Sequence, residues 1–248
     1  MLKFGRKYRL FHPGLDPHEF RFRTDAAIMK IAAISDLHGH LPAIPKCDLL
    51  LIAGDICPLS DHSHWAQSQF LTHDFAKWRE GLDVKSVVYI AGNHDWIFER
   101  DRIGAQRWKE RLQANRSPGE TCYLQDDYCI LDHLKIYGTP WQPRFFDWAF
   151  NLDEPELALK FAEIPADTDI LISHGPPLGY GDRSSHSNRP CGSVSLLAAI
   201  ARIKPRLCVF GHIHEGRGQW ERNGTILANV THVDRAYRPV YEPMVFDV

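Results

Sequence analysis

The sequence predicts an α/β fold in which two β-sheets form a sandwich flanked by helices. Three observations support this. Short apolar runs recur from Met29 onward, and each ends in a polar loop. Helical patterns lie between several of these runs, which is typical of βαβ units. Shorter β-like runs with turn signals lie outside this alternation and can supply a second sheet.

Five apolar runs are the strongest strand candidates. They are rich in Val, Ile and Leu, as expected of strands buried on both faces. They cover residues 29–35, 47–53, 85–91, 168–173 and 205–210. Each is followed by a loop that carries His or Asp. In open α/β sheets the carboxyl ends of the strands form binding sites, so we expect a site at this edge.

Four segments are predicted to be helices. They are His64–Arg79, Arg102–Ala114, Glu154–Ile164 and Ser193–Ile203. Asp153 suits the N-cap of the third, and Pro155 occupies an early helical position. Gly192 precedes the fourth helix, and Pro205 ends it.

The remaining β-like runs lie at residues 121–138, 218–230 and 240–248. Asn223-Gly224 is a hairpin turn signal. We expect these runs to build the second sheet. Residues 1–28 show no sustained periodicity and are interpreted as an N-terminal extension, and 29–248 as a single domain, because no linker or repeat interrupts them.

Composition excludes several classes of function. The 248 residues carry a formal net charge of -2, so no global basic field is present to bind a nucleic-acid backbone. No apolar run approaches the length of a membrane span, and the basic N-terminus lacks the apolar region of a signal peptide. The six cysteines are scattered, as is usual for reduced thiols. These features predict a cytoplasmic protein.

Histidine is abundant, with 14 residues, and several lie in the loops that follow the five strands. In chain order these loops contain D-x-H, GD, GNHD, HG and GHxH. Each motif alone is weak, but five in succession at strand ends are not expected by chance. The side chains of this constellation are Asp36, His38, Asp55, Asn93, His174, His212 and His214.

Their chemistry indicates a centre for two metal ions. Mixed carboxylate and imidazole ligands suit Mn²⁺, Fe or Zn²⁺. On an extended segment, Asp36 and His38 point to the same side and can bind one ion together, as can the equally spaced His212 and His214. Asp55 can bridge two ions through its two oxygens. Asn93 adds a neutral oxygen, which favours an anionic substrate.

Two adjacent ions can activate a water molecule and hold a phosphoryl group. The leaving oxygen then needs a proton, and His94, directly after Asn93, is the predicted general acid. Asp95 is predicted to orient His94 or to keep it protonated.

The five motifs resemble the calcineurin-like metallophosphoesterase superfamily, in the family's order and across most of the chain after Met29. The resemblance implies a four-layer α/β/β/α sandwich of two mixed sheets. It also implies how the ligands divide. One ion takes Asp36, His38, Asp55 and His214, and the other takes Asp55, Asn93, His174 and His212.

Segments 138–151, 168–183 and 206–218 also resemble the metallophosphoesterase-domain group (the 239 brain protein-like group), which is similar to class III cyclic nucleotide phosphodiesterases. The implied substrates are phosphodiesters, including cyclic nucleotides. Some members have a substituted ligand histidine and low activity, whereas His212 and His214 are both present here. GNHD stands where the animal proteins have GNHE, which keeps the acidic neighbour.

Other residues near the motifs have two interpretations each. Arg183 and Arg217 either contact phosphate oxygens or are ordinary surface arginines. His40 either reaches substrate or is a solvated loop residue. The aromatic residues of 141–150 either stack a base or pack between the two sheets. His62 and the remaining histidines lie outside the motifs and are interpreted as surface or core residues.

The sequence therefore predicts a metal-dependent phosphoesterase that acts on a small phosphoester or nucleotide. Two alternatives remain. One is a nucleotide-binding or scaffold protein of low activity that retains the metal site, and the other is a phosphomonoesterase or protein phosphatase. The sequence does not predict the oligomeric state, and it contains no basic stretch that would favour a nuclease.

Overall fold

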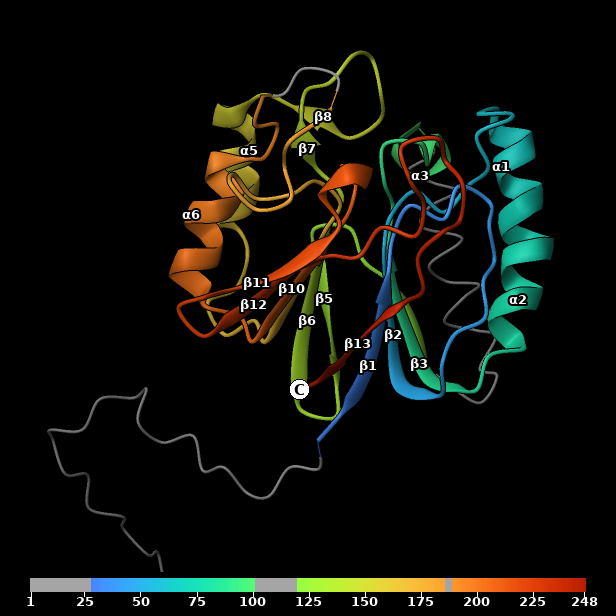
Figure 1. Ribbon diagram of the computed structural model, residues 1–248, viewed down its shortest axis with the longest axis horizontal. Coiled ribbons are helices and arrows are strands. Elements are labelled where there is room, and N and C mark those ends of the chain that lie inside the picture. The colour runs from blue at the N-terminus through green and yellow to red at the C-terminus, as the bar shows by residue number, and fades with distance from the viewer. Residues whose placement is uncertain (1–27, 101–119, 186–188) are drawn as a thin grey trace, which may run out of the picture.

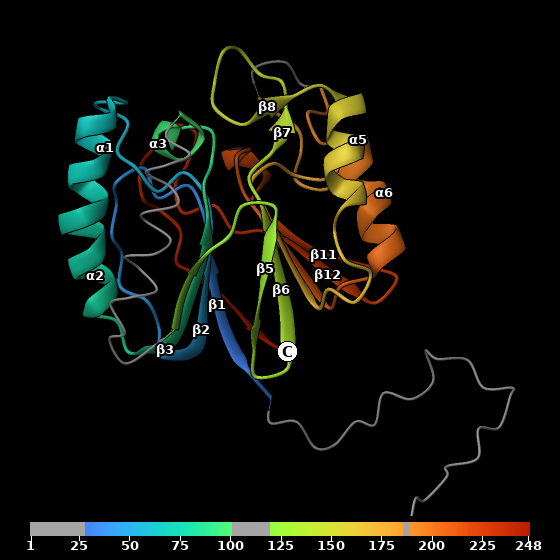
Figure 2. The same cartoon turned by 180° about the vertical axis from the view of Figure 1, so that it is seen from behind.

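The computed structural model of the chain describes residues 28–100, 120–185 and 189–248 (Figure 1). Residues 1–27 of the predicted extension and the predicted helix Arg102–Ala114 lie outside the described residues. Two large mixed sheets pack against each other, and helices cover both outer faces (Figure 2). The four-layer α/β/β/α sandwich is thus confirmed.

The first sheet has the strand order β13-β1-β2-β3-β4. Its strands are β1 (Lys30–Ile34), β2 (Cys47–Ala53), β3 (Val84–Ile90), β4 (Glu120–Tyr123) and β13 (Met244–Asp247). Four of them run parallel, and only β13 is antiparallel, at the edge beside β1.

The second sheet has the order β11-β12-β10-β9-β6-β5. Its strands are β5 (Asp127–Leu131), β6 (Leu134–Thr139), β9 (Ile170–Ser173), β10 (Leu207–Phe210), β11 (Gly218–Arg222) and β12 (Thr225–Asn229). The predicted Asn223-Gly224 turn joins β11 to β12, and both residues have positive φ. A short pair, β7 (Gln142–Pro143) and β8 (Asn151–Leu152), lies apart.

The predicted assignment of strands to sheets is wrong in part. The five motif-bearing strands do not share one sheet, because β1, β2 and β3 lie in the first and β9 and β10 in the second. Conversely, β13 and β4 join the first sheet. An apolar run shows that a strand is buried on both faces, but in a sandwich either sheet meets this condition, since each lies between a helix layer and the other sheet.

Alternation along the strands divides the core into layers. Ile31 and Ala33 of β1 face the second sheet, whereas Ala32 and Ile34 face the helices of the first sheet. Leu171 and Cys208 similarly face the helices of the second sheet. This period of two is the geometry of a strand with apolar neighbours on both sides.

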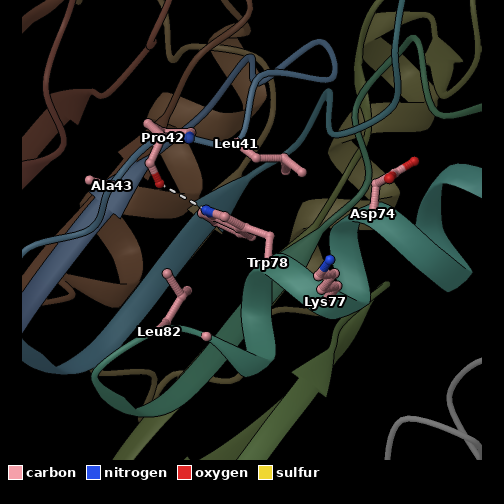
Figure 3. A pocket seen from close by; sticks show the side chains of 8 residues that line it. Leu41, Pro42, Ala43, Asp74, Lys77, Trp78 and Leu82 are labelled. Atoms are coloured by element: carbon pink, nitrogen blue, oxygen red, sulfur yellow. Dashed lines mark hydrogen bonds between the residues drawn. The ribbon is translucent and has the colours of Figure 1, made fainter.

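One helical segment covers the first sheet. It comprises α1 (His64–Phe70), a π-helical turn (Leu71–Phe75) and α2 (Ala76–Glu80), in the place of the predicted helix His64–Arg79. The short α3 (Trp96–Arg100) follows β3. A hollow lies between residues 41–43 and α2, where the Trp78 indole donates a hydrogen bond to the Pro42 carbonyl (2.8 Å; Figure 3).

The second sheet is covered by α5 (Glu154–Ala162) and α6 (Val194–Ile203), which confirms both predicted helices. Ser193 caps α6 by accepting a hydrogen bond from the Leu196 N–H (3.1 Å). Among the residues described, no helix is long and apolar enough to span a membrane.

Candidate metal centre

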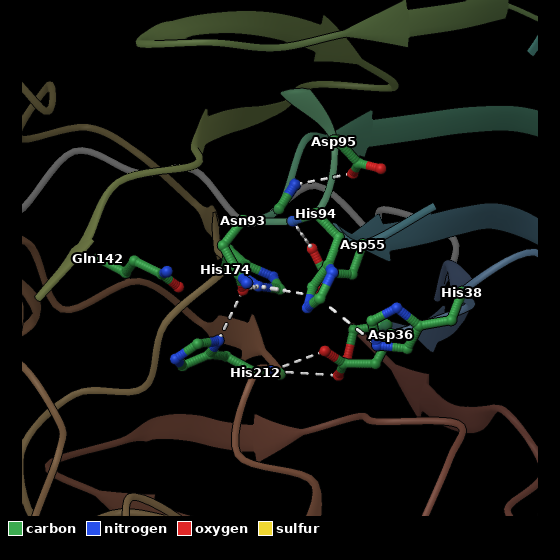
Figure 4. Close-up of polar contacts among 12 residues, drawn as sticks. Asp36, His38, Asp55, Asn93, His94, Asp95, Gln142, His174 and His212 are labelled. Atoms are coloured by element: carbon green, nitrogen blue, oxygen red, sulfur yellow. Dashed lines mark hydrogen bonds and ion pairs between the residues drawn. The ribbon is translucent and has the colours of Figure 1, made fainter. Parts of the chain in front are cut away.

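The carboxyl ends of five strands from both sheets meet at one edge of the sandwich. Here the loops after β1, β2, β3, β9 and β10 bring together the side chains that the sequence predicts as metal ligands (Figure 4). They are Asp36, His38, Asp55, Asn93, His174, His212 and His214. Most of them are buried.

One group of donor atoms surrounds His214. Its Nε2 lies 3.6 Å from Asp36 Oδ1 and 3.4 Å from His38 Nε2. The Nε2 of His38 lies in turn 3.7 Å from Asp55 Oδ2. These four side chains are the set that the family resemblance implies for one ion.

A second group surrounds Asn93. Its Oδ1 lies 2.9 Å from His174 Nε2 and 2.8 Å from His212 Nδ1. The Nε2 of His174 lies 3.5 Å from the same Asp55 Oδ2. Asp55 therefore lies between the two groups, within reach of one histidine from each.

The local backbone differs from the predicted extended D-x-H segments. Asp36, His38, Asp55 and His212 all have φ between 45° and 67°, and His214 begins a 3₁₀ turn (His214–Gly216). The expectation that residues two apart converge through strand geometry is therefore wrong. Left-handed conformations turn these side chains toward the centre, and such strained residues concentrate at functional sites.

Close packing of the loops depends on glycine, as two positions show. A Cβ at Gly92 would overlap the Asp55 carboxylate and the His174 ring, and a Cβ at Gly211 would overlap Ser35 and the Asp36 carboxylate. The absence of a Cβ therefore lets the loops approach the ligand side chains closely at both positions.

The buried carboxylates lack a permanent cation. Asp36 and Asp55 are 0% and 1% exposed, and among the described residues their ion pairs are with histidine only. Burying a carboxylate without a cation is costly. Burial opposes ionisation, yet the neighbouring histidines hold the pKa of both groups below the ordinary value. A positive metal ion fits this environment.

The histidine nitrogens are also arranged for metal. The His174 Nδ1 faces the Ala53 carbonyl at 2.9 Å and can donate to it, which directs Nε2 to the centre, where it can ligate once its proton is displaced. Burial lowers the pKa of His38 and of His212 to about 3, so both rings are neutral and able to ligate. Three sets of donor atoms lie within 4.8 Å of one another: Asp36, His38 and His214; His38, Asp55 and His94; Asp36, Asp55 and His174.

His94 lies beside the centre and is held on three sides. Its backbone N–H donates to Asp55 Oδ1 (2.8 Å), and its ring stacks obliquely on Trp148 with centroids 4.2 Å apart. Its Nδ1 lies 3.3 Å from the Nε2 of His62. The side-chain amide of Gln67 donates to the His94 carbonyl (2.6 Å) and so ties this loop to α1.

Asp95 is directed away from the His94 ring. Its carboxylate accepts backbone hydrogen bonds from Ile56 (3.0 Å), Cys57 (2.8 Å) and Gly92 (2.9 Å). These bonds join the loop after β2 to the loop after β3. Asp95 was predicted to orient His94 or to keep it protonated, but it is His62, which the sequence did not single out, that faces the Nδ1 of the His94 ring.

Arg183 and Arg217, for which phosphate contact was one of two interpretations, have other surroundings. The Arg217 guanidinium donates to the carbonyls of Thr231 (2.5 Å) and Glu242 (2.6 Å) and packs over the Tyr241 ring. Arg183 is exposed, and its backbone pairs with Pro190. The His40 ring donates to the Tyr237 carbonyl at 3.3 Å.

The aromatic residues of 141–150 do not pack between the sheets, so that expectation is wrong. Trp148 contacts His94 and His62, and Phe150 packs on the helix side of the first sheet. Phe145 and Phe146 are 44% and 78% exposed, and the Phe145 ring lies 6.3 Å from that of His212. The segment therefore borders the metal centre.

Sequence reasoning also missed Tyr237. Its ring makes edge contacts with His38 and His214, at centroid distances of 5.0 and 4.9 Å. Neither Tyr237 nor His62 belongs to a recognisable motif. Tyr237 lies on a loop beyond the last motif, and His62 lies near the end of the loop that carries Asp55. Only the three-dimensional arrangement identifies them.

Comparison with known proteins agrees with this geometry. The sequence profile of the calcineurin-like phosphoesterases matches residues 29–216. The chain is 34% identical to metallophosphoesterase domain-containing protein 1 of Homo sapiens over 237 residues, which cover 88% of this chain and 71% of the human protein. It is 30% identical to a UPF0046 protein of Caenorhabditis elegans, across 89% of this chain and 60% of the relative.

A solved crystal structure superposes with a TM-score of 0.59 over 89% of this chain and 99% of its own, at 16% identity. That likeness concerns the fold. The family profile spans all five strand-end motifs, and the similarity to the human protein extends over most of both chains. The chain therefore belongs to the calcineurin-like phosphoesterase family.

Proposed function

We propose that the chain is a binuclear metallophosphoesterase that hydrolyses phosphodiesters. The observation that carries the proposal is the division of seven donor side chains into two groups joined by the buried Asp55 carboxylate. Two carboxylates without a Lys or Arg partner among the described residues support a cationic occupant.

In this proposal Asp36, His38 and His214 would hold one ion, and Asn93, His174 and His212 would hold the other. Asp55, which lies between the two groups, would contribute to both. The ligand set accepts Mn²⁺, Fe or Zn²⁺. Bound ions of this kind supply Lewis acidity toward a phosphoryl oxygen and lower the pKa of water.

His94 donates the proton that the leaving oxygen requires. Since its Nδ1 faces His62, its Nε2 is the nitrogen left for the substrate. Stacking on Trp148 restricts rotation of the ring, and the backbone bond to Asp55 fixes its distance from the ligand set. Pre-positioned acids of this type accelerate proton transfer without reorganisation at the moment of reaction.

Nucleotide phosphodiesters, including cyclic nucleotides, are the proposed substrate class. Phe145 and Phe146 expose aromatic surface beside His212, where a base can stack while its phosphate is held at the centre. The similarity to metallophosphoesterase domain-containing protein 1 supports phosphoester chemistry in general.

Hydrolysis of bis-p-nitrophenyl phosphate by the Mn²⁺-loaded protein tests the function. We expect turnover that chelation abolishes and Mn²⁺ restores. A panel of 2′,3′- and 3′,5′-cyclic nucleotides, phosphomonoesters and phosphopeptides then ranks the substrates by kcat/KM. A metal-loaded protein that hydrolyses no phosphodiester would contradict the proposal, and tight mononucleotide binding without turnover would favour a binding role.

A further inference from the structure

A short loop after β12 places one aromatic residue over the metal centre. Val233 and Pro239 pair as an isolated antiparallel bridge, and residues 234–238 form the tip between them. The Asp234 carbonyl accepts from the Tyr237 N–H (2.8 Å), and the Asp234 N–H donates to the Arg238 carbonyl (2.9 Å). Tyr237 lies near the end of this tip, two residues before Pro239.

Several side chains hold this tip in place. Arg217 bonds to carbonyls at both ends of the loop, those of Thr231 and Glu242. At the tip, the Asp234 carboxylate accepts from the Arg238 guanidinium (2.5 and 2.8 Å). His40, from the loop after β1, donates to the Tyr237 carbonyl. The tip is thus tied to the loop that carries Asp36 and His38.

Tyr237 has a backbone conformation that its residue type disfavours. Its φ is 58°, in the left-handed region that glycine and asparagine adopt more readily than a bulky residue. Large side chains with positive φ are outliers that concentrate at functional sites. A glycine at this position would adopt the positive φ without strain, but no aromatic ring would then lie beside the metal centre.

The ring lies against the centre itself. It contacts His38 and His214 edge to face, with interplanar angles of 74° and 88°, and its centroid lies 6.4 Å from that of His94. These rings belong to one ligand group and to the proposed acid. The Tyr237 ring therefore lies beside both a ligand group and the proposed acid, near the place where a phosphoryl group is held in the proposed function, and 40% of its surface remains open to solvent.

We propose that the Tyr237 hydroxyl binds substrate by donating a hydrogen bond to a non-bridging phosphoryl oxygen. The inference rests on the proposed function and adds a residue to it. A neutral hydroxyl held near an anion stabilises charge without needing a counterion. The alternative donor, Arg217, has its guanidinium engaged with two backbone carbonyls.

Replacement of Tyr237 by Phe tests the role because it removes only the hydroxyl. In Mn²⁺-loaded protein we expect the dissociation constant for inorganic phosphate, measured by calorimetry, to rise about tenfold. The value of kcat/KM for bis-p-nitrophenyl phosphate should fall by a similar factor, while metal content and melting temperature stay unchanged. Tyr241→Phe, on the same loop, is the matched control and should bind phosphate as wild type does.

Equal phosphate affinity in wild type and Tyr237→Phe overturns the inference, whether or not the protein turns over. Absence of measurable phosphate binding by the metal-loaded wild type overturns it as well. Wild type that binds phosphate more tightly than Tyr237→Phe but hydrolyses no ester supports the inference while contradicting the proposed function.

Discussion

The imidazole of His94 is held by neighbours from two segments, the loop between β2 and α1 and the loop between β7 and β8. Asp55 fixes its backbone, Trp148 stacks on its ring, and His62 faces its Nδ1. None of these contacts requires a metal ion. The acid and the metal ligands are therefore separable by mutation, although His94 is adjacent to Asn93 in the sequence.

Replacing His94 by Ala should lower turnover and leave metal content intact. We expect a loss of about 10²–10⁴-fold for esters with poor leaving groups, the usual contribution of a general acid. The loss should be smaller for p-nitrophenyl esters, whose leaving group needs no proton. A variant that loses metal, or that loses activity equally for all leaving groups, would show that His94 has a different role.

Among the elements, the turn at Gly92 joins the end of β3 to the metal centre. Gly92→Ala should destabilise the protein by about 1–3 kcal/mol, since the added methyl overlaps the Asp55 and His174 side chains. The affinity for metal should also fall. Urea denaturation with and without Mn²⁺ measures both the loss of stability and the loss of stabilisation by the metal.

Gly81, at the end of α2, is the matched control. It has ordinary helical φ, and a Cβ there meets only normal contacts. Gly81→Ala should therefore be neutral or slightly stabilising. Similar effects of the two substitutions would indicate that the turn at Gly92 is not constrained by the site.

The elements also show how far sequence reasoning extends. Apolar runs identified β1, β2, β3, β9 and β10, because their periodicity depends only on burial. The same runs did not show which strands are neighbours, since pairing order is a property of the assembled sandwich. The polar residues at their ends were predicted as a set because metal chemistry restricts the residue types.

Contacts between loops could not be predicted from the sequence. Tyr237 and His62 lie outside every motif and approach the centre only after the chain has folded. The role of Arg217 also depended on folding, because a guanidinium near a metal loop binds whichever acceptors the neighbouring loops provide. Left-handed φ at Asp36 and His38 was unexpected for the same reason.

At the scale of the whole molecule, pH should control metal binding. Burial disfavours the charged form of His174, but the adjacent Asp55 charge outweighs it and raises the pKa to about 9. Near pH 7 the metal-free ring therefore carries a proton that an entering ion must displace. Raising the pH removes this competitor, so affinity should increase with pH.

For one displaced proton, the affinity for Mn²⁺ should rise about tenfold per pH unit between pH 6 and 8. Calorimetry in buffers of different ionisation enthalpy measures the proton released. Because His38 and His212 have pKa values of about 3, they add no competing proton in this range. Burial disfavours the charged form of His214, but the Asp36 carboxylate outweighs it and raises the pKa, so a proton on His214 makes the dependence steeper. An affinity independent of pH would contradict the assignment of His174 as a ligand.

The central claim is that both sheets together build a centre for two ions, and metal content tests it most directly. After Mn²⁺ loading and removal of excess metal, mass spectrometry of the wild type should give about two ions per chain. Asp36→Asn and His214→Ala should each retain about one. A wild type that holds one ion or none, in folded protein, would contradict the claim.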